Sequence, residues 1–226
     1  MEPDEAAIIG GASPGQPAPP RLWRFVIEEA SWLLAAFAVT VLATRLVALP
    51  GGAWAAAAPG LSLFGFDGLV GAHVVRADRS KLAGWLALDR GIVIRGLAGG
   101  GVLLALNGLY GALLDALGIV PPDLAEQLRT MLPEAVLVVW AGLLAPVVEE
   151  LYFRGRLLDA LDARLGPIAS GWITSVLFAA VHGIREFFPA YLAFACVLLY
   201  LRRRTGGLSA SIAAHVLNNV FALYAG

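Results

Sequence analysis

The sequence is poor in cysteine and in charged residues. Its one cysteine, Cys196, excludes an intramolecular disulfide and a metal site built from several cysteines. Only 15% of the 226 residues are charged and the net charge is −1, so the chain lacks the basic surface typical of nucleic-acid binding. Hydrophobic residues make up 59%, above the roughly 45–50% of soluble domains. The composition predicts an integral membrane protein with the lipid bilayer around it and no nucleic-acid partner.

The N-terminal segment lacks the features of a signal peptide. Residues 1–20 have no basic segment followed by an apolar one, and they are rich in proline and glycine. We expect a disordered tail there, followed by a single membrane domain over residues 21–226.

Apolar runs predict an all-α, polytopic helical bundle with about six transmembrane helices. Residues 52–75 are apolar but interrupted by Pro59, glycines and Asp67, so we expect a loop or re-entrant segment there, with a seventh span as the alternative. Residues 76–90 are basic and partly amphipathic, which predicts a segment on the membrane surface. The six expected spans cover about 25–49, 91–117, 133–152, 167–182, 187–201 and 208–224.

Basic residues set the expected orientation. With six spans, eleven of the sixteen lysines and arginines follow the first, third and fifth spans. The positive-inside rule places those segments in the cytoplasm and both termini outside. If residues 52–75 cross the membrane, the N-terminus moves to the cytoplasmic side and the later spans keep their orientation.

Three charged residues follow an apolar run in the third span. Residues 135–148 contain no charge, and Glu149, Glu150 and Arg154 come after them. A helix of that length rises about 21 Å, roughly two-thirds of the hydrocarbon core. Each ionisable group at mid-bilayer costs roughly 2.5–3.5 kcal/mol, so the cluster predicts a functional site.

The two glutamates are expected to differ in role. Glu150 lies four residues before Arg154, the orientation that favours a helical ion pair; a purely structural pair is the alternative. Glu149 lies about 100° around the helix, and burial disfavours its ionised form, which suits a base that takes a proton from water. Because Pro146 lacks a backbone donor, we expect the Gly142 carbonyl to lose its partner and to leave room for that water.

Later apolar runs contain two histidines and an asparagine. His182 ends the fourth span, while His215 and Asn219 share one face of the sixth. An imidazole and a carboxamide facing one pocket are suited to donate hydrogen bonds to an oxyanion, and packing between helices is the alternative. The remaining histidine, His73, is expected in a loop. The His-Glu-x-x-His motif of zinc proteases is absent, and Asp67 has no second aspartate in a matching span.

These residues resemble the motifs of the CPBP family of intramembrane proteases, which includes CAAX prenyl endopeptidases and bacteriocin-immunity proteins. The family pattern is Glu-Glu-x-x-x-Arg, then Phe-x-x-x-His, then His-x-x-x-Asn/Asp. All three motifs occur in order within about residues 130–226, as Glu149-Glu150-x-x-x-Arg154, Phe178-x-x-x-His182 and His215-x-x-x-Asn219.

The resemblance implies a protease core at about residues 130–226 and a role for each motif residue. Glu149 and His182 would activate water, His215 and Asn219 would stabilise the tetrahedral intermediate, and Glu150 and Arg154 would organise the site. The family is also described as metal-dependent. No metal is required by the sequence; if one is used, zinc or another divalent ion would be held by Glu149, His182 and His215.

The predicted function is hydrolysis of a peptide bond in a membrane-associated substrate, lipidated or not. The resemblance implies a site that opens toward the cytoplasm and a peptide or protein substrate on that side, and the composition favours a bacterial inner membrane. The alternative is a non-proteolytic protein, either a peptide-binding immunity scaffold or a small proton-coupled transporter. A transporter more often has internal repeats, and none is visible in this sequence.

Overall fold

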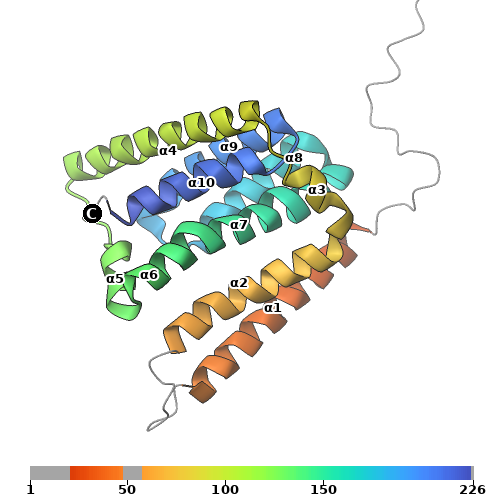
Figure 1. Cartoon of the computed structure of the whole chain (residues 1–226), viewed down its shortest axis with the longest axis horizontal. Helices are drawn as coiled ribbons and strands as arrows, with labels where there is room; N and C mark the ends of the chain where they lie inside the picture. The colour runs from red at the N-terminus through yellow and green to blue at the C-terminus, as the bar shows by residue number, and fades with distance from the viewer. Residues whose placement is uncertain (1–20, 48–57, 225–226) are drawn as a thin grey trace, which may run out of the picture.

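The computed structural model describes residues 21–47 and 58–224, and every regular element within these ranges is a helix (Figure 1). The predicted tail at residues 1–20 lies outside the described residues. Three stretches are long and apolar enough to cross a membrane, at 22–46, 90–116 and 134–181. The predicted all-α membrane bundle is therefore confirmed. Its long helices are α1 (Leu22–Val47), α2 (Ala58–Ala77), α4 (Arg90–Ala116), α8 (Leu158–Val181), α9 (Phe188–Thr205) and α10 (Ser209–Ala222).

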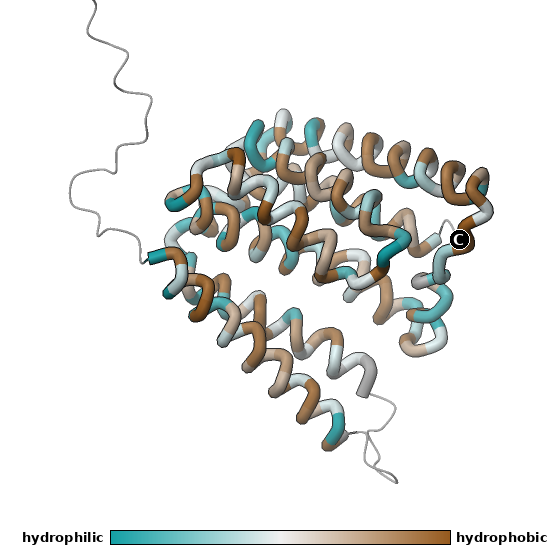
Figure 2. Tube along the Cα trace, turned by 180° about the vertical axis from the view of Figure 1, so that it is seen from behind, coloured by the Kyte–Doolittle hydropathy of each residue, from teal (hydrophilic) through white to brown (hydrophobic). Residues whose placement is uncertain are grey.

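Large apolar side chains face outward along the long helices, as contact with lipid requires. On α1, Leu34, Phe37 and Leu42 are exposed, and on α4 the same is true of Leu97 and Leu109. Figure 2 shows hydrophobic residues over most of the length of these helices. An apolar surface on both sides of a helix is stable in a bilayer but not in water.

Residues 58–75 form most of α2, so the loop predicted there was wrong for the part of it that the structure describes. Close packing offsets the low helix propensity of its glycines. A Cβ added to Gly71 would lie 3.3 Å from the Val148 side chain, and one added to Gly65 would lie 3.5 Å from Thr40. His73, also predicted in a loop, lies on this helix with Nε2 3.3 Å from Glu29 Oε1 of α1. α2 is therefore the additional helix that the alternative of seven spans requires.

The third predicted span is longer than expected. Four short segments, α6 (Glu134–Leu137), η3 (Val138–Leu144), α7 (Ala145–Glu150) and η4 (Leu151–Leu157), run without a break into α8. η3 and η4 are π-helical. The predicted end near Tyr152 was wrong, because buried side chains continue through Leu158 and Leu161. The helix breaks at Gly166, whose φ of 77° favours glycine, and Pro167 then begins the second half of α8.

The basic segments of the chain meet at one end of the bundle. Arg156 donates to Glu29 Oε1 of α1 and to Asp78 Oδ2 after α2, and Arg202 of α9 donates to Asp159 Oδ1 of α8. Two short helices, η2 (Arg79–Lys81) and α3 (Leu82–Trp85), close this end; they form the segment predicted on the membrane surface. We refer to this region as the basic end.

The opposite end carries the C-terminus (Figure 1). There the short helix α5 (Leu124–Met131) places Arg129 against the Leu223 carbonyl, and η5 (Arg185–Phe187) connects α8 to α9. Because α1 and α2 are antiparallel, α1 begins at the basic end. The start of α1 therefore lies on the side that seven spans predict for the N-terminal end of the membrane domain, and not on the side that six spans predict.

Glycines bring α4 close to α10. A Cβ added to Gly96 would lie 2.8 Å from the Ala213 Cβ and 3.2 Å from the Ala210 carbonyl oxygen. Neither neighbour is a flexible side chain, so the helices would have to separate.

We therefore expect Gly96→Ala to lower the stability of the protein in detergent by about 1–3 kcal/mol, the usual cost of overpacking. The matched control is Gly101→Ala on the same helix, where an added Cβ meets nothing within 4 Å. Thermal unfolding followed by circular dichroism tests the pair. Equal melting temperatures for the two variants would contradict the close approach.

Candidate active site

Glu150 and Arg154 form the buried ion pair that their spacing predicts. Arg154 Nη1 lies 3.0 Å from Glu150 Oε1, and the exposed fractions of the two side chains are 3% and 0%. Arg154 Nη2 also donates to the Ala195 carbonyl of α9 at 3.3 Å, and its guanidinium lies 4.2 Å from the centre of the Phe178 ring. The pair thereby connects the helical segments α7 and η4 to α8 and α9.

His215 of α10 lies between the two glutamates. Its Nδ1 is 3.2 Å from Glu150 Oε1, and its Nε2 is 3.7 Å from Glu149 Oε2. The rings of Phe194 and Phe178 contact it edge-on, with centroids at 4.8 and 5.9 Å. The imidazole is therefore held in one orientation, with one nitrogen toward each carboxylate.

Each glutamate has one carboxylate oxygen to spare. Oε2 of Glu149 and Oε2 of Glu150 have no hydrogen-bond partner among the described residues. The two differ in access, because the Glu149 side chain is 26% exposed and the Glu150 side chain is fully buried. Both of these oxygens are buried atoms, but the Glu149 side chain as a whole is partly exposed, so the role of general base stays a prediction for Glu149.

His182 lies in the same aromatic cluster but does not touch Glu149. Its Nδ1 is 2.7 Å from the Phe178 carbonyl oxygen, and its ring stacks on Tyr191 with centroids 4.2 Å apart. Because a carbonyl only accepts hydrogen bonds, Nδ1 holds the proton and Nε2 is left as an acceptor. His182 and Glu149 share no direct hydrogen bond or ion pair, so their joint action on a water stays a prediction.

Asn219 is anchored on a carbonyl that the π-helical segment η3 leaves free. The Ala145 N–H donates to the Trp140 carbonyl, five residues back. In this register the Ala141 carbonyl would need a donor from residue 146, which is a proline. Nδ2 of Asn219 supplies that donor at 3.0 Å. The sequence analysis named the Gly142 carbonyl as the one freed by Pro146. The carbonyl that Asn219 binds is that of Ala141, one residue earlier.

Several residues near the site were missed or set aside in the sequence. Asp67 of α2 accepts a hydrogen bond from Trp140 Nε1 at 2.7 Å and lies close enough to Glu149 to interact electrostatically. Tyr191 stacks on His182. Neither has a motif spacing that would reveal it, because both come from other helices and meet the site only in the folded bundle.

The proposed metal ligands do not form a ready metal site. Within residues 21–47 and 58–224, no three side chains of His, Cys, Asp or Glu are grouped so that they could hold a metal ion. Nε2 of His182 is left for a ligand because Nδ1 faces a carbonyl oxygen, whereas His215 is engaged with both glutamates. The steps derived below use protein groups and water.

Comparison with known proteins agrees with the motifs. Residues 131–221 match the family model described as "Type II CAAX prenyl endopeptidase Rce1-like". A protein of Bacillus subtilis (strain 168) named "Putative membrane peptidase YdiL" is 28% identical over 86 residues, which cover 38% of this chain and 35% of that protein. The match thus spans about a third of the length of this relative. No solved structure matches the chain.

The resemblance read from the motifs is therefore confirmed for the C-terminal part of the chain. The apolar helices and the match to a membrane-peptidase family together identify an integral membrane protein with a peptidase-like region at residues 131–221.

Loss of Arg154 is expected to destabilise the fold. Arg154→Ala leaves Glu150 buried without its cation, and breaking a buried pair in this way costs about 3–5 kcal/mol. The control is Arg185→Ala, since the Arg185 side chain is 95% exposed. Melting temperatures in detergent compare the two variants, and an unchanged value for Arg154→Ala would show that the pair contributes little.

Proposed function

We propose that this protein is a membrane-embedded endopeptidase that hydrolyses a peptide bond in a membrane-associated peptide or protein by means of an activated water. The observation that carries the proposal is the position of His215 between Glu149 and the buried Glu150–Arg154 pair, with a Glu149 side chain that is partly exposed as a whole. Lipidated peptides are included among the substrates because the matching family model is described as a prenyl endopeptidase.

The first step assigns the water to Glu149. A water bound at the Glu149 carboxylate gives up a proton to it as the water oxygen attacks the substrate carbonyl carbon. We assign Nε2 of His182, which is left as an acceptor, as a second acceptor for the same water. Glu149 then returns the proton to the amine that leaves, so the products are a carboxylic acid and an amine.

The second assignment concerns the negative charge that develops on the carbonyl oxygen. Asn219 uses one of its two side-chain N–H groups on Ala141, which leaves the other for the oxyanion. His215 directs Nε2 toward Glu149 while Glu150 accepts a hydrogen bond from Nδ1. With a proton on both nitrogens, the ring donates to the oxyanion, and Glu150 balances its charge.

Glu149→Gln is expected to lower the cleavage rate by about 10²–10⁴, the usual contribution of a general base, while the protein stays folded. The assay uses internally quenched peptides with and without a prenyl group, in detergent or vesicles. Glu126→Gln, at a side chain that is 65% exposed on α5, is the matched control and should cleave as wild type does.

Cleavage by Glu149→Gln at the wild-type rate would remove Glu149 from the mechanism. If His182 acts on the same water, His182→Ala together with Glu149→Gln should be no slower than the slower single variant. Peptide binding without cleavage by the wild-type protein would favour the peptide-binding scaffold instead.

We further propose a bacterial inner membrane with the basic end in the cytoplasm, on the strength of the positive-inside rule. Only Arg45, Arg129 and Arg185 of the sixteen lysines and arginines lie toward the opposite end. His182 ends α8 near η5, whereas Arg154 lies two residues from Arg156 and its carbonyl accepts a hydrogen bond from Arg202, and both of these arginines belong to the basic end. The cytoplasmic opening of the site that the resemblance implies is therefore kept as part of the proposal.

Cysteine labelling tests this orientation. In a Cys196→Ala background, a membrane-impermeant maleimide added to intact cells should label Arg185→Cys and should reach Arg79→Cys only after lysis. Both positions adjoin short helices at opposite ends of the bundle. The reverse pattern would place the basic end outside the cytoplasm and would overturn the proposed orientation.

A further inference from the structure

Three asparagines form a chain of hydrogen bonds that ends at the proposed oxyanion donor. Nδ2 of Asn107 on α4 donates to Oδ1 of Asn218 on α10 at 2.8 Å. Nδ2 of Asn218 donates to Oδ1 of Asn219 at 3.4 Å, and Nδ2 of Asn219 donates to the Ala141 carbonyl at 3.0 Å. The chain therefore connects α4 through α10 to the π-helical segment η3.

One backbone carbonyl fixes the direction of the whole chain. Because the Ala141 oxygen only accepts, the amide nitrogen of Asn219 must face it, and the Asn219 oxygen must face Asn218. The same logic turns the Asn218 oxygen toward the nitrogen of Asn107. All three amides thus point the same way, an arrangement in which each hydrogen bond polarises the next and makes the last N–H a better donor.

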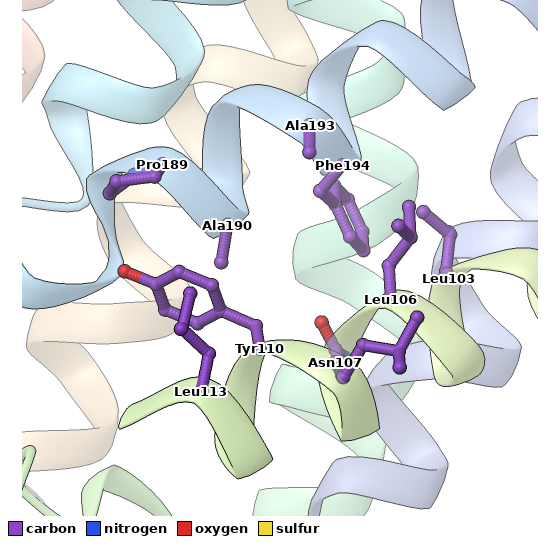
Figure 3. A pocket seen from close by; sticks show the side chains of 10 residues that line it. Leu103, Leu106, Asn107, Tyr110, Leu113, Pro189, Ala190, Ala193 and Phe194 are labelled. Carbon is purple, nitrogen blue, oxygen red and sulfur yellow. The ribbon is translucent and has the colours of Figure 1, made fainter. Parts of the chain in front are cut away.

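The other end of the chain lies at an apolar cavity of about 220 Å³ between α4 and α9 (Figure 3). The cavity is lined by Asn107 and Tyr110 together with leucines of α4 and with Phe194 of α9. The Tyr110 hydroxyl donates to the Glu186 carbonyl, so it holds α4 to η5 without taking part in the asparagine chain.

Helix packing alone does not account for this chain. α4 and α10 already approach closely through Gly96 and Gly100, whose added Cβ atoms would lie 2.8 and 2.5 Å from α10 side chains. An amide in a lipid-facing helix is costly in a bilayer and is retained where it has a polar partner. The partner of Asn107 is Asn218, which in turn donates a hydrogen bond to Asn219.

We infer that Asn107 is a positioning residue for the proposed peptidase, acting through Asn218 to orient the Asn219 side chain. In that orientation one Asn219 N–H is engaged with Ala141 and the second is free for the substrate oxyanion. The inference rests on the proposed function, because it gives Asn107 a share in transition-state stabilisation that no motif of the sequence assigns to it.

Asn107→Leu and Asn107→Asp test the inference on an internally quenched peptide. Leucine removes the donor, and aspartate keeps the shape but has no N–H to give. Both should lower kcat by about 10- to 100-fold, less than the roughly 10²–10³ that complete loss of an oxyanion donor costs, with KM nearly unchanged because the oxyanion forms only in the transition state. Tyr110→Phe is the matched control; it removes a hydrogen bond of the same helix and cavity and should leave kcat unchanged.

A double variant separates positioning from a structural role. If Asn107 acts through Asn219, Asn107→Leu should cost nothing further in an Asn219→Ala background, whereas equal losses in both backgrounds would overturn the inference. An unchanged kcat in Asn107→Asp would overturn it as well.

A second readout does not depend on activity. In protein labelled with ¹⁵N-asparagine, the side-chain amide signal of Asn219 should shift on Asn107→Leu and not on Tyr110→Phe. Absence of that shift would show that the chain does not reach Asn219. If the wild-type protein cleaves no peptide, the proposed function fails, while this measurement still decides whether Asn107 orients Asn219.

Discussion

The buried pair of Glu150 and Arg154 is the interaction on which the arrangement of the site depends. Neither charge is stable in a low-dielectric interior without the other, so the two side chains must face each other and the helices around them must close over both. Arg154 reaches the Ala195 carbonyl of α9, and Glu150 reaches His215 of α10. One ion pair thereby fixes the positions of three helical segments, and Glu149, the adjacent residue, is placed beside His215 as a consequence.

One π-helical segment, η3, precedes this pair, and a second, η4, contains its arginine. A π-turn adds a residue to the helical turn, shifts the register of the backbone and is frequent at functional sites. In η3 the shift leaves the Ala141 carbonyl to Asn219, and in η4 it carries Arg154 toward the interior. The sequence contains Pro146 as a sign that the backbone pattern is interrupted, but nothing in it gives the register, which is why Gly142 was named instead of Ala141.

Local spacing predicted what depends on one helix, and contacts between helices decided the rest. The four-residue spacing of Glu150 and Arg154 predicted the ion pair that the structure contains. The helix α2 was missed because its glycines oppose a helix in isolation and become favourable only against Thr40 and Val148. The pairing of Glu149 with His215 rather than directly with His182 also depends on how α10 packs, and no spacing along the chain contains that information.

The N-terminal helices support the site although they lie outside the matching segment at residues 131–221. Arg156 follows Arg154 by two residues, and it binds Glu29 of α1 and Asp78 after α2. The same short segment η4 therefore carries one arginine toward the site and another toward the N-terminal helices. Asp67 of α2 binds Trp140, and Gly71 contacts Val148, which directly precedes Glu149. These contacts connect α2 to η3 and to α7, so the N-terminal helices pack directly against the segment that carries Glu149 and Glu150.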